Sequence, residues 1–365
     1  MEYVKLKDIC FFLPKSKIKA GEGMDNGKYI FFTSSDTKVS KINEYLYDDE
    51  AVIIGTGGKP SCNYCKGKFS VSTDNFVLKS NTINIKYLYY FLRNNNLSIL
   101  EKGFHGAGLK HISKDYVSDI NVPLLDYSKQ CKIVSTLDSI YININFYKDQ
   151  LKNFDNIVKS QFIEMFGDPI QNEKAWNSSI LNEVTDVRDG THDSPKYHDR
   201  GYPFVTSKNL IDGKIDFSTC QFISEKDYLH FNDRSRIDDG DILMPMIGTI
   251  GGAIIVKKDR EFSIKNVALI KFTKDNTKIN RTFILYILNS DSMNNYFELT
   301  KKGGTQKFMA LGVIRNIPII VPPIELQNEF AKFVNQIDKS KFIIQKQIKL
   351  LEELLEKKMN EYFGD

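Results

Sequence analysis

The stretch Val122–Asp168 reads VPLLDYSKQCKIVSTLDSIYININFYKDQLKNFDNIVKSQFIEMFGD, and Val321–Asp365 reads VPPIELQNEFAKFVNQIDKSKFIIQKQIKLLEELLEKKMNEYFGD. Both open on Val-Pro and close on Phe-Gly-Asp. The two starts lie 321 − 122 = 199 residues apart, and the two ends lie 365 − 168 = 197 residues apart. Repetition at this spacing predicts that a whole domain was duplicated together with the segment that follows it.

Each repeat predicts one long amphipathic helix. Residues 126–166 contain neither glycine nor proline, and Gly167 and Pro169 then provide a stop signal. Seam residues recur in alternating steps of four and three, which is typical of a coiled coil. A helix of this length would span roughly 60 Å. The seam positions are Ile133, Leu137, Ile140, Ile144, Tyr147, Leu151, Phe154 and Val158 in the first repeat, and Phe330, Val334, Ile337, Lys341, Ile344, Ile348, Leu351 and Leu355 in the second.

We expect the two helices to pair antiparallel within one chain, with pairing between two chains as the alternative. The predicted fold class is α+β, with two similar mixed α/β domains separated by these two helices. The predicted domains are residues 1–121, a helix in 122–168, residues 169–320, and a second helix in 321–365. Shorter elements are predicted as strands at 204–206, 241–244, 253–256 and 267–272, and as helices at 85–94 and 281–289.

The two mixed blocks also resemble each other. Tyr29-Ile-Phe-Phe-Thr-Ser-Ser parallels Tyr202-Pro-Phe-Val-Thr-Ser-Lys, and Asp48-Asp-Glu-Ala-Val-Ile-Ile-Gly-Thr-Gly-Gly parallels Asp238-Asp-Gly-Asp-Ile-Leu-Met-Pro-Met-Ile-Gly-Thr-Ile-Gly-Gly. Each block ends in a loop rich in glycine, at residues 106–113 and 303–309. The order of these signals is the same while the residues between them differ, which indicates a common scaffold with different surface residues.

This layout resembles the DNA-specificity (S) subunits of type I restriction–modification enzymes. The motifs that carry the resemblance are Asp189-Gly-Thr-His-Asp-Ser-Pro-Lys-Tyr, Gly201-Tyr-Pro-Phe-Val-Thr-Ser-Lys-Asn-Leu, Gly240-Asp-Ile-Leu-Met-Pro-Met-Ile-Gly-Thr-Ile-Gly and Ile320-Val-Pro-Pro-Ile-Glu-Leu-Gln. The first block has no evident counterpart of residues 189–197.

The resemblance implies two target-recognition domains, each reading half of a split DNA sequence, and helices that set the gap between the halves. It implies double-stranded DNA as a partner, together with two copies of a methyltransferase subunit docked on the helices and a motor-nuclease subunit for cleavage. This chain would hold no cofactor, and S-adenosylmethionine would bind the partner methyltransferase.

Reading DNA requires cations for phosphates and amides or forked donors for base edges. In the first block, the segment Lys59-Pro-Ser-Cys-Asn-Tyr-Cys-Lys-Gly-Lys68 is interpreted as a loop flanked by glycine. Its candidates are Lys59, Asn63, Tyr64, Lys66 and Lys68, and the final loop adds Lys110 and His111. The second block contributes Thr191, His192, Lys196, Lys208, Thr305, Gln306 and Lys307. For each of these the alternative is an ordinary exposed polar residue.

The composition of the chain is compatible with a DNA-binding protein. The net charge is only +4, but residues 1–121 hold 17 Lys and Arg against 13 Asp and Glu. A local cationic surplus favours a polyanionic partner. The five cysteines form no disulfide framework, and the first residues carry no secretory signal, so we expect a cytoplasmic protein. No apolar run approaches the length of a membrane span.

Catalytic chemistry finds little support in the sequence. Cys62-x-x-Cys65 is half a zinc motif without a second pair, and Gly55-Thr-Gly-Gly-Lys lacks the spacing of a phosphate-binding loop. We see no methyltransferase motif and no nucleophile elbow. The prediction is a non-catalytic reader of DNA; the alternatives are an enzyme with an unrecognised active site and a coiled-coil scaffold for other proteins.

Overall fold

A computed structural model describes residues 2–37, 39–248, 251–272, 278–300 and 308–364. The chain divides into two compact units. Unit 1 comprises Met1–Gln150 and Ile344–Asp365, and unit 2 comprises Leu151–Ile343. Both divisions fall inside the long helices α4 (Tyr127–Phe166) and α10 (Ile324–Phe363). The chain therefore passes from one unit to the other only within these two helices.

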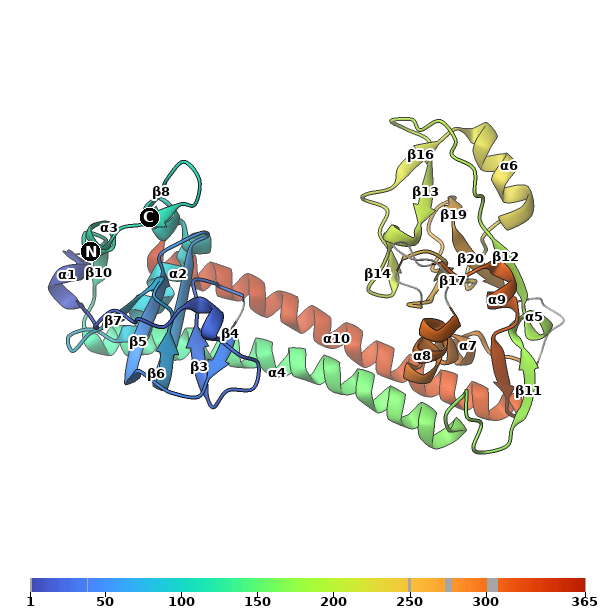
Figure 1. Ribbon diagram of the computed structural model, residues 1–365, viewed down its shortest axis with the longest axis horizontal. Helices are drawn as coiled ribbons and strands as arrows, with labels where there is room; N and C mark the ends of the chain where they lie inside the picture. The colour runs from blue at the N-terminus through green and yellow to red at the C-terminus, as the bar shows by residue number, and fades with distance from the viewer. Residues whose placement is uncertain (1, 38, 249–250, 273–277, 301–307, 365) are drawn as a thin grey trace. The chain divides into compact units, whose positions relative to one another are not determined.

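Unit 1 is built on a six-stranded sheet with one helix against it (Figure 1). The strand order is β2 (Phe11–Phe12), β7 (Asn75–Lys79), β5 (Tyr47–Gly55), β6 (Ser61–Val71), β3 (Tyr29–Phe32) and β4 (Val39–Ile42). Only the β3–β6 pair is parallel. Because successive side chains of a strand point to opposite faces, Val52 and Ile54 pack with α2 (Ile85–Glu101), whereas Ala51 and Ile53 pack in a separate cluster.

Unit 2 repeats this strand order in two smaller sheets. One sheet has the order β12 (Asp186–Asp189), β20 (Val267–Lys271), β17 (Ile242–Pro245) and β18 (Ile254–Ile255). The other has the order β16 (Gln221–Ile223), β13 (Tyr202–Thr206) and β19 (Ser263–Lys265). The short strands β18 and β19 replace the single long β6, and β13 runs parallel to β19 as β3 does to β6. The two units thus share one scaffold.

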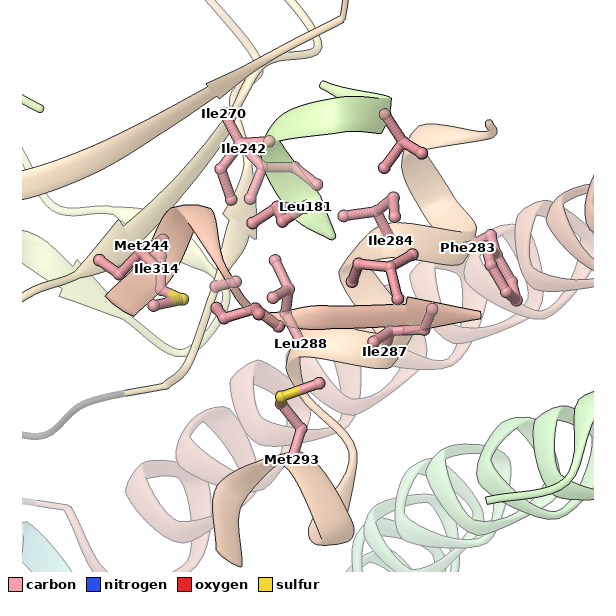
Figure 2. Close-up of a cluster of buried hydrophobic side chains, with 14 of the residues drawn as sticks. Leu181, Ile242, Met244, Ile270, Phe283, Ile284, Ile287, Leu288, Met293 and Ile314 are labelled. Carbon is pink, nitrogen blue, oxygen red and sulfur yellow. The ribbon is translucent and has the colours of Figure 1, made fainter. Parts of the chain in front are cut away.

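The main core of unit 2 forms around α7 (Arg281–Leu288). Figure 2 shows Ile284, Ile287 and Leu288 of this helix beside Leu181 and Met293. The elements that surround α7 are α5 (Leu181–Val184), α8 (Asp291–Thr300), α9 (Leu311–Arg315) and strands β17 and β20. Helix α7 was predicted, whereas α8 and α6 (Glu225–Ser235) were not. Helix α2 extends beyond its predicted end at residue 94.

The long helices pair antiparallel in each unit. In unit 1, Lys148 Nζ lies 2.9 Å from Glu352 Oε1, while Leu137 and Met359 share one cluster. In unit 2, Lys341 pairs with Asp155, and Phe330 packs against Phe162 and Phe166. Residues later in α4 therefore contact residues earlier in α10, as in an antiparallel pair. The prediction of pairing within one chain is confirmed, and Asp155 explains the lysine on the seam.

Each unit also ties its first strand to the strand that precedes its long helix. In unit 1, β1 (Glu2–Lys5) pairs antiparallel with β10 (Asn121–Leu124). In unit 2, β11 (Asn177–Ile180) pairs antiparallel with β21 (Pro318–Val321). The predicted boundaries at 121/122 and 320/321 fall within β10 and β21. The remaining short elements are α1 (Leu6–Ile9), η1 (Ala20–Glu22), β8 (Phe104–His105), β9 (His111–Ile112), α3 (Lys114–Ser118), η2 (Ser207–Asn209), β14 (Leu210–Ile211) and β15 (Lys214–Ile215).

A buried glutamine closes the same contact in both units. Gln130 Oε1 accepts from the backbone N–H of Asn84, and its Nε2 donates to Leu125 O. Gln327 Oε1 accepts from the backbone N–H of Asn280, and its Nε2 donates to Pro322 O. Each asparagine caps the helix that follows it, α2 or α7. The long helix of each unit is thereby fixed to the start of that unit's packed helix.

Candidate nucleic-acid interface

Both units join the glycine-rich loop to the turn that follows the central strand. In unit 1, Gly58 N donates to Lys110 O at 2.9 Å, and Ile112 N donates to Thr56 O at 3.1 Å. In unit 2, Met309 N donates to Met246 O at 2.8 Å. The isolated bridges Gly57–His111 and Ile247–Phe308 repeat the same pairing. The described ends of the two segments, residues 110–112 and 308–309, therefore occupy equivalent positions.

In unit 1 this joint gathers Lys59, Lys110 and His111 at one end of the sheet. Ser34 Oγ donates to Gly57 O at 2.7 Å and so anchors the turn that carries Lys59. His111 Nδ1 lies 3.2 Å from Thr56 O. The Lys59 and Lys110 side chains are exposed, and within the described part of the chain neither has an acidic partner. Unpaired ammonium groups on anchored turns suit contacts to phosphate oxygens.

The other four unit 1 candidates lie on a strand, so the prediction of a loop at residues 59–68 was wrong. Strand β6 pairs with β5 along its length, from Tyr47–Phe69 to Gly55–Ser61. At ~3.3 Å per residue, Lys68 lies roughly 23 Å from Ser61. Lys66 and Lys68 therefore do not join the cluster at the turn. Polar residues between and after the buried Cys62 and Cys65 disguised the strand.

These strand residues already have partners inside unit 1. Tyr64 Oη donates to Glu50 Oε1 at 2.6 Å, and Lys86 Nζ lies 5.0 Å from the centre of the Tyr64 ring. Burial and then Glu50 raise the pKa of the Tyr64 phenol. The remaining contacts are Lys66 Nζ to Glu50 Oε2 at 3.3 Å, Asn63 Nδ2 to Ser35 O at 3.3 Å, and Lys68 Nζ at 4.6 Å from the Tyr45 ring centre.

In unit 2, the segment that begins at Asp189 builds a polar cluster after β12. Gly190 is required because a Cβ there would lie 2.3 Å from Ile264 O. The buried Asp189 carboxylate pairs with Arg234 through Oδ1 and lies 3.1 Å from His192 Nε2 through Oδ2. His192 Nδ1 lies 2.7 Å from Asn266 Oδ1. His192 is thus held from both sides, while its side chain stays 64% exposed.

The remaining unit 2 candidates fall into three groups. Thr191 supports the backbone, since its N–H donates to Ile264 O and its Oγ1 accepts from Asp193 N. Lys196 is exposed, and Lys208 of η2 lines a cleft of about 980 Å³. Thr305, Gln306 and Lys307 lie outside the described residues. Among the described candidates of unit 2, it is His192 that joins a polar cluster, together with Asp189, Arg234 and Asn266.

The sequence did not indicate several residues that line the unit 2 cleft. Tyr197, Gln221 and Asn266 line the cleft with Lys208. Asn266 has a backbone φ of +54°, a conformation that asparagine tolerates better than most residues. Its place between the hydrophobic runs of β19 and β20 was a readable signal for a turn.

Metal binding finds no support in the described ranges, where no three His, Cys, Asp or Glu side chains gather as a ligand set. Cys62 packs in the cluster that contains α2, and Cys65 packs in the cluster on the opposite sheet face. Within the same described ranges, no helix is both long and apolar enough to cross a membrane.

Cysteine reactivity should follow burial. Burial raises the pKa of the Cys10 and Cys62 thiols to about 12, and that of Cys220 to about 11. Because the thiolate is the nucleophile, we expect iodoacetamide at pH 8 to alkylate the partly exposed Cys131 at least tenfold faster than Cys62, with roughly tenfold corresponding to one pKa unit. Peptide mass spectrometry measures the rates, and denatured protein is the control. Equal rates in the folded chain would contradict the buried position of Cys62.

The sequence matches the family described as "Type I restriction modification DNA specificity domain" over residues 1–153 and 173–354. The chain belongs to this family. The match covers both units, in agreement with the repeated scaffold, and it identifies the chain as a type I restriction–modification specificity subunit.

Specificity subunits of known systems are similar to this chain over about half of its length or more. The MjaVIII specificity subunit of Methanocaldococcus jannaschii is 28% identical over 319 residues, which cover 81% of this chain and 73% of the relative. The EcoDI specificity subunit of Escherichia coli is 30% identical over 172 residues, 47% of this chain and 38% of the relative. The crystal structure of the S subunit from M. genitalium has a TM-score of 0.64 at 13% identity, covering 100% of this chain and 96% of that one. The last likeness shows the fold.

Proposed function

We propose that this specificity subunit reads a two-part DNA sequence, one half with each unit, and directs a partner adenine methyltransferase to it. The observation that carries the proposal is the repeated scaffold, in which both units pair the turn after the central strand with an equivalent later segment, residues 110–112 in unit 1 and 308–309 in unit 2. Two equivalent readers on one chain suit a target with two separated halves. The base edges of the major groove supply the sequence information.

The chain itself contributes no chemistry in this proposal. Among the residues that the structure describes, the two ring nitrogens of His192 face Asp189 and Asn266, and Asp189 also pairs with Arg234, so no nucleophile hydrogen-bonds to this histidine. Methyl transfer would take place in a methyltransferase subunit that binds S-adenosylmethionine and flips the target adenine. We propose two such subunits, one for each unit, and a motor-nuclease subunit where the complex also cleaves.

Phosphate contacts would come from cations that have no acidic partner within the described residues, namely Lys59 and Lys110 in unit 1 and Lys196 and Lys208 in unit 2. Each such contact releases counterions, so binding should weaken as salt increases. Replacement of Lys59 and Lys110 by alanine should reduce the salt dependence by about two contacts. A scaffold that holds only proteins would show no salt-sensitive DNA binding.

Methylation mapping tests the function directly. The partner methyltransferase is expressed with and without this chain, and methyl-adenine is located in the host DNA by long-read sequencing. We expect one split motif to lose its methylation when the chain is absent. An unchanged methylation pattern, with the methyltransferase shown to be present and folded, would favour the scaffold alternative.

A further inference from the structure

The cleft in unit 2 is lined by apolar residues such as Phe204 and Pro245 and by polar side chains. Phe204 is only 1% exposed, so this part of the lining is fixed by the core. Polar lining residues come from η2, from the start of β16 and from the turn between β19 and β20. The charged residues of the lining are Lys208, Asp212 and Lys265, and the neutral hydrogen-bonding residues include Tyr197, Thr206, Thr219, Gln221 and Asn266.

Strand register places two amides of the cleft on opposite sides of β13. Gln221 is paired with Phe204 on one side of β13, and Ser263 is paired with Phe204 on the other side. Asn266 directly follows the last residue of β19, the parallel neighbour that carries Ser263. Both Gln221 and Asn266 line the cleft, so one bound molecule can contact both amides.

The two amides differ in what they can offer to a ligand. Within the part of the chain that the structure describes, no hydrogen bond engages the Gln221 amide, and the residue is exposed on the outer strand of its sheet. The Asn266 amide already has one side occupied, because Oδ1 lies 2.7 Å from His192 Nδ1. Gln221 can therefore offer both the donor and the acceptor of its amide to a ligand. Asn266 can offer only the part of its amide that does not face His192.

His192 and Asp189 hold Asn266 in place. The Asp189 carboxylate is 5% exposed and is fixed by Arg234 of α6, so the imidazole is held against a rigid partner. The imidazole then orients the Asn266 side chain at the edge of the cleft. This chain of contacts assigns His192 a positioning role in place of a direct contact with a base.

We propose that Gln221 and Asn266 determine the bases read by unit 2, with Gln221 recognising an adenine and Asn266 a neighbouring base. The inference rests on the proposed function. Adenine presents N7 as an acceptor and the N6 amino group as a donor, which match the two groups of a glutamine amide. Lys208 lines the same cleft and contacts the DNA backbone phosphate beside these two bases.

The experiment uses the full chain with its partner methyltransferase and a DNA library in which each base of the mapped motif is varied. Gln221→Ala should lower the preference for adenine at one position of one half-sequence by roughly ten- to hundredfold. Asn266→Gly, which suits the positive φ, should relax a second position by roughly three- to tenfold, as expected for one hydrogen bond. Gln171→Ala removes an exposed glutamine outside the cleft and serves as the control.

The positioning role of His192 has its own readout. His192→Ala should relax the same position as Asn266→Gly, and the double variant should add little to either single variant. Its thermal unfolding is measured beside the wild type, since a merely structural role would lower stability without selecting one position. An effect of His192→Ala at a different base would assign the imidazole a direct contact.

Two outcomes overturn the proposal. The first is wild-type base preference in both Gln221→Ala and Asn266→Gly; the second is an equal loss across both half-sequences in folded variants. If Asn266→Gly fails to fold, the base preference of Gln221→Ala alone tests the proposal. A failure of the proposed function itself is distinguishable, because the wild-type chain would then direct methylation to no motif.

Discussion

Replacement of Gln327 by alanine is expected to lower the free energy of unfolding of unit 2 by about 3–5 kcal/mol. The side chain is fully buried, and it bonds Asn280 N at 2.8 Å, Lys278 O at 3.1 Å and Pro322 O at 2.8 Å. Alanine leaves these three backbone groups without their partner. An unsatisfied buried group costs roughly 1–3 kcal/mol, so the losses together form a large share of a domain's stability.

The single tryptophan provides a selective probe for this prediction. Trp176 packs against the main core of unit 2, and its Nε1 donates to Phe166 O at 2.9 Å. Denaturant unfolding followed by tryptophan fluorescence should therefore shift in Gln327→Ala. Gln130→Ala should destabilise unit 1 by a similar amount, visible in far-ultraviolet circular dichroism. Gln336→Ala, an exposed glutamine on α10, should change stability by at most about 0.5 kcal/mol.

A change below about 1 kcal/mol in Gln327→Ala would contradict the role assigned to the buried glutamine, since unsatisfied groups cost more than this. A change below about 1 kcal/mol in the free energy of unfolding of Gln130→Ala would contradict the conclusion that equivalent buried glutamines close both units. Each outcome is separable, because the two glutamines belong to different units.

Removal of one heptad from both long helices should shorten the gap between the two half-sequences by about three base pairs. The deletion takes out residues 147–153 of α4 and residues 345–351 of α10, which belong to neither main hydrophobic cluster. Seven residues correspond to roughly 10.5 Å of helix, and one base pair to ~3.4 Å. Because seven residues are one full repeat of the seam, the pairing of the remaining residues is kept.

Methylation mapping of the shortened chain measures both gap and half-sequences. The half-sequences should stay unchanged, since the deletion leaves the loops of each unit intact. Alanine at Asp149 and Lys152 keeps the helix length and should leave the gap unaltered. An unchanged gap in the shortened chain, or a changed half-sequence, would refute the role of the helices as a spacer.

The long helices could be predicted because their signals are local and repeated. Each seam runs through eight positions, and Gly167 and Pro169 mark where α4 ends. Strand β6 was misread because polar residues and Gly67 interrupt its apolar residues, and its pairing with β5 involves residues distant in the sequence. Helix α6 was missed because its sequence, EKDYLHFNDRS, is almost entirely polar and buries only Phe231 and Ser235.

The candidate interface could be predicted only in part. The glycine-bearing loop at residues 106–113 was recognised because glycine and lysine occur there together, whereas most of the loop predicted at residues 59–68 belongs to strand β6. The contact between His192 and Asn266 joins residues 74 positions apart, and no local pattern signals it. Gln221 and Lys208 face one cleft only because β16 and β13 pair as they do. The register between distant strands therefore decides which of these side chains meet, and no local sequence pattern reveals that register.

The division of unit 1 into two chain segments has a consequence during synthesis on the ribosome. Its core includes Met359, and Phe363 packs against Tyr87 and Phe91, so residues near the end of α10 complete a structure begun at Glu2. Unit 2 is continuous and emerges in between. At ~5–20 residues per second, its 193 residues take roughly 10–40 s to translate. For that interval the nascent unit 1 exposes the apolar surface of α2 that α10 later covers, and this is when it most needs protection by a chaperone.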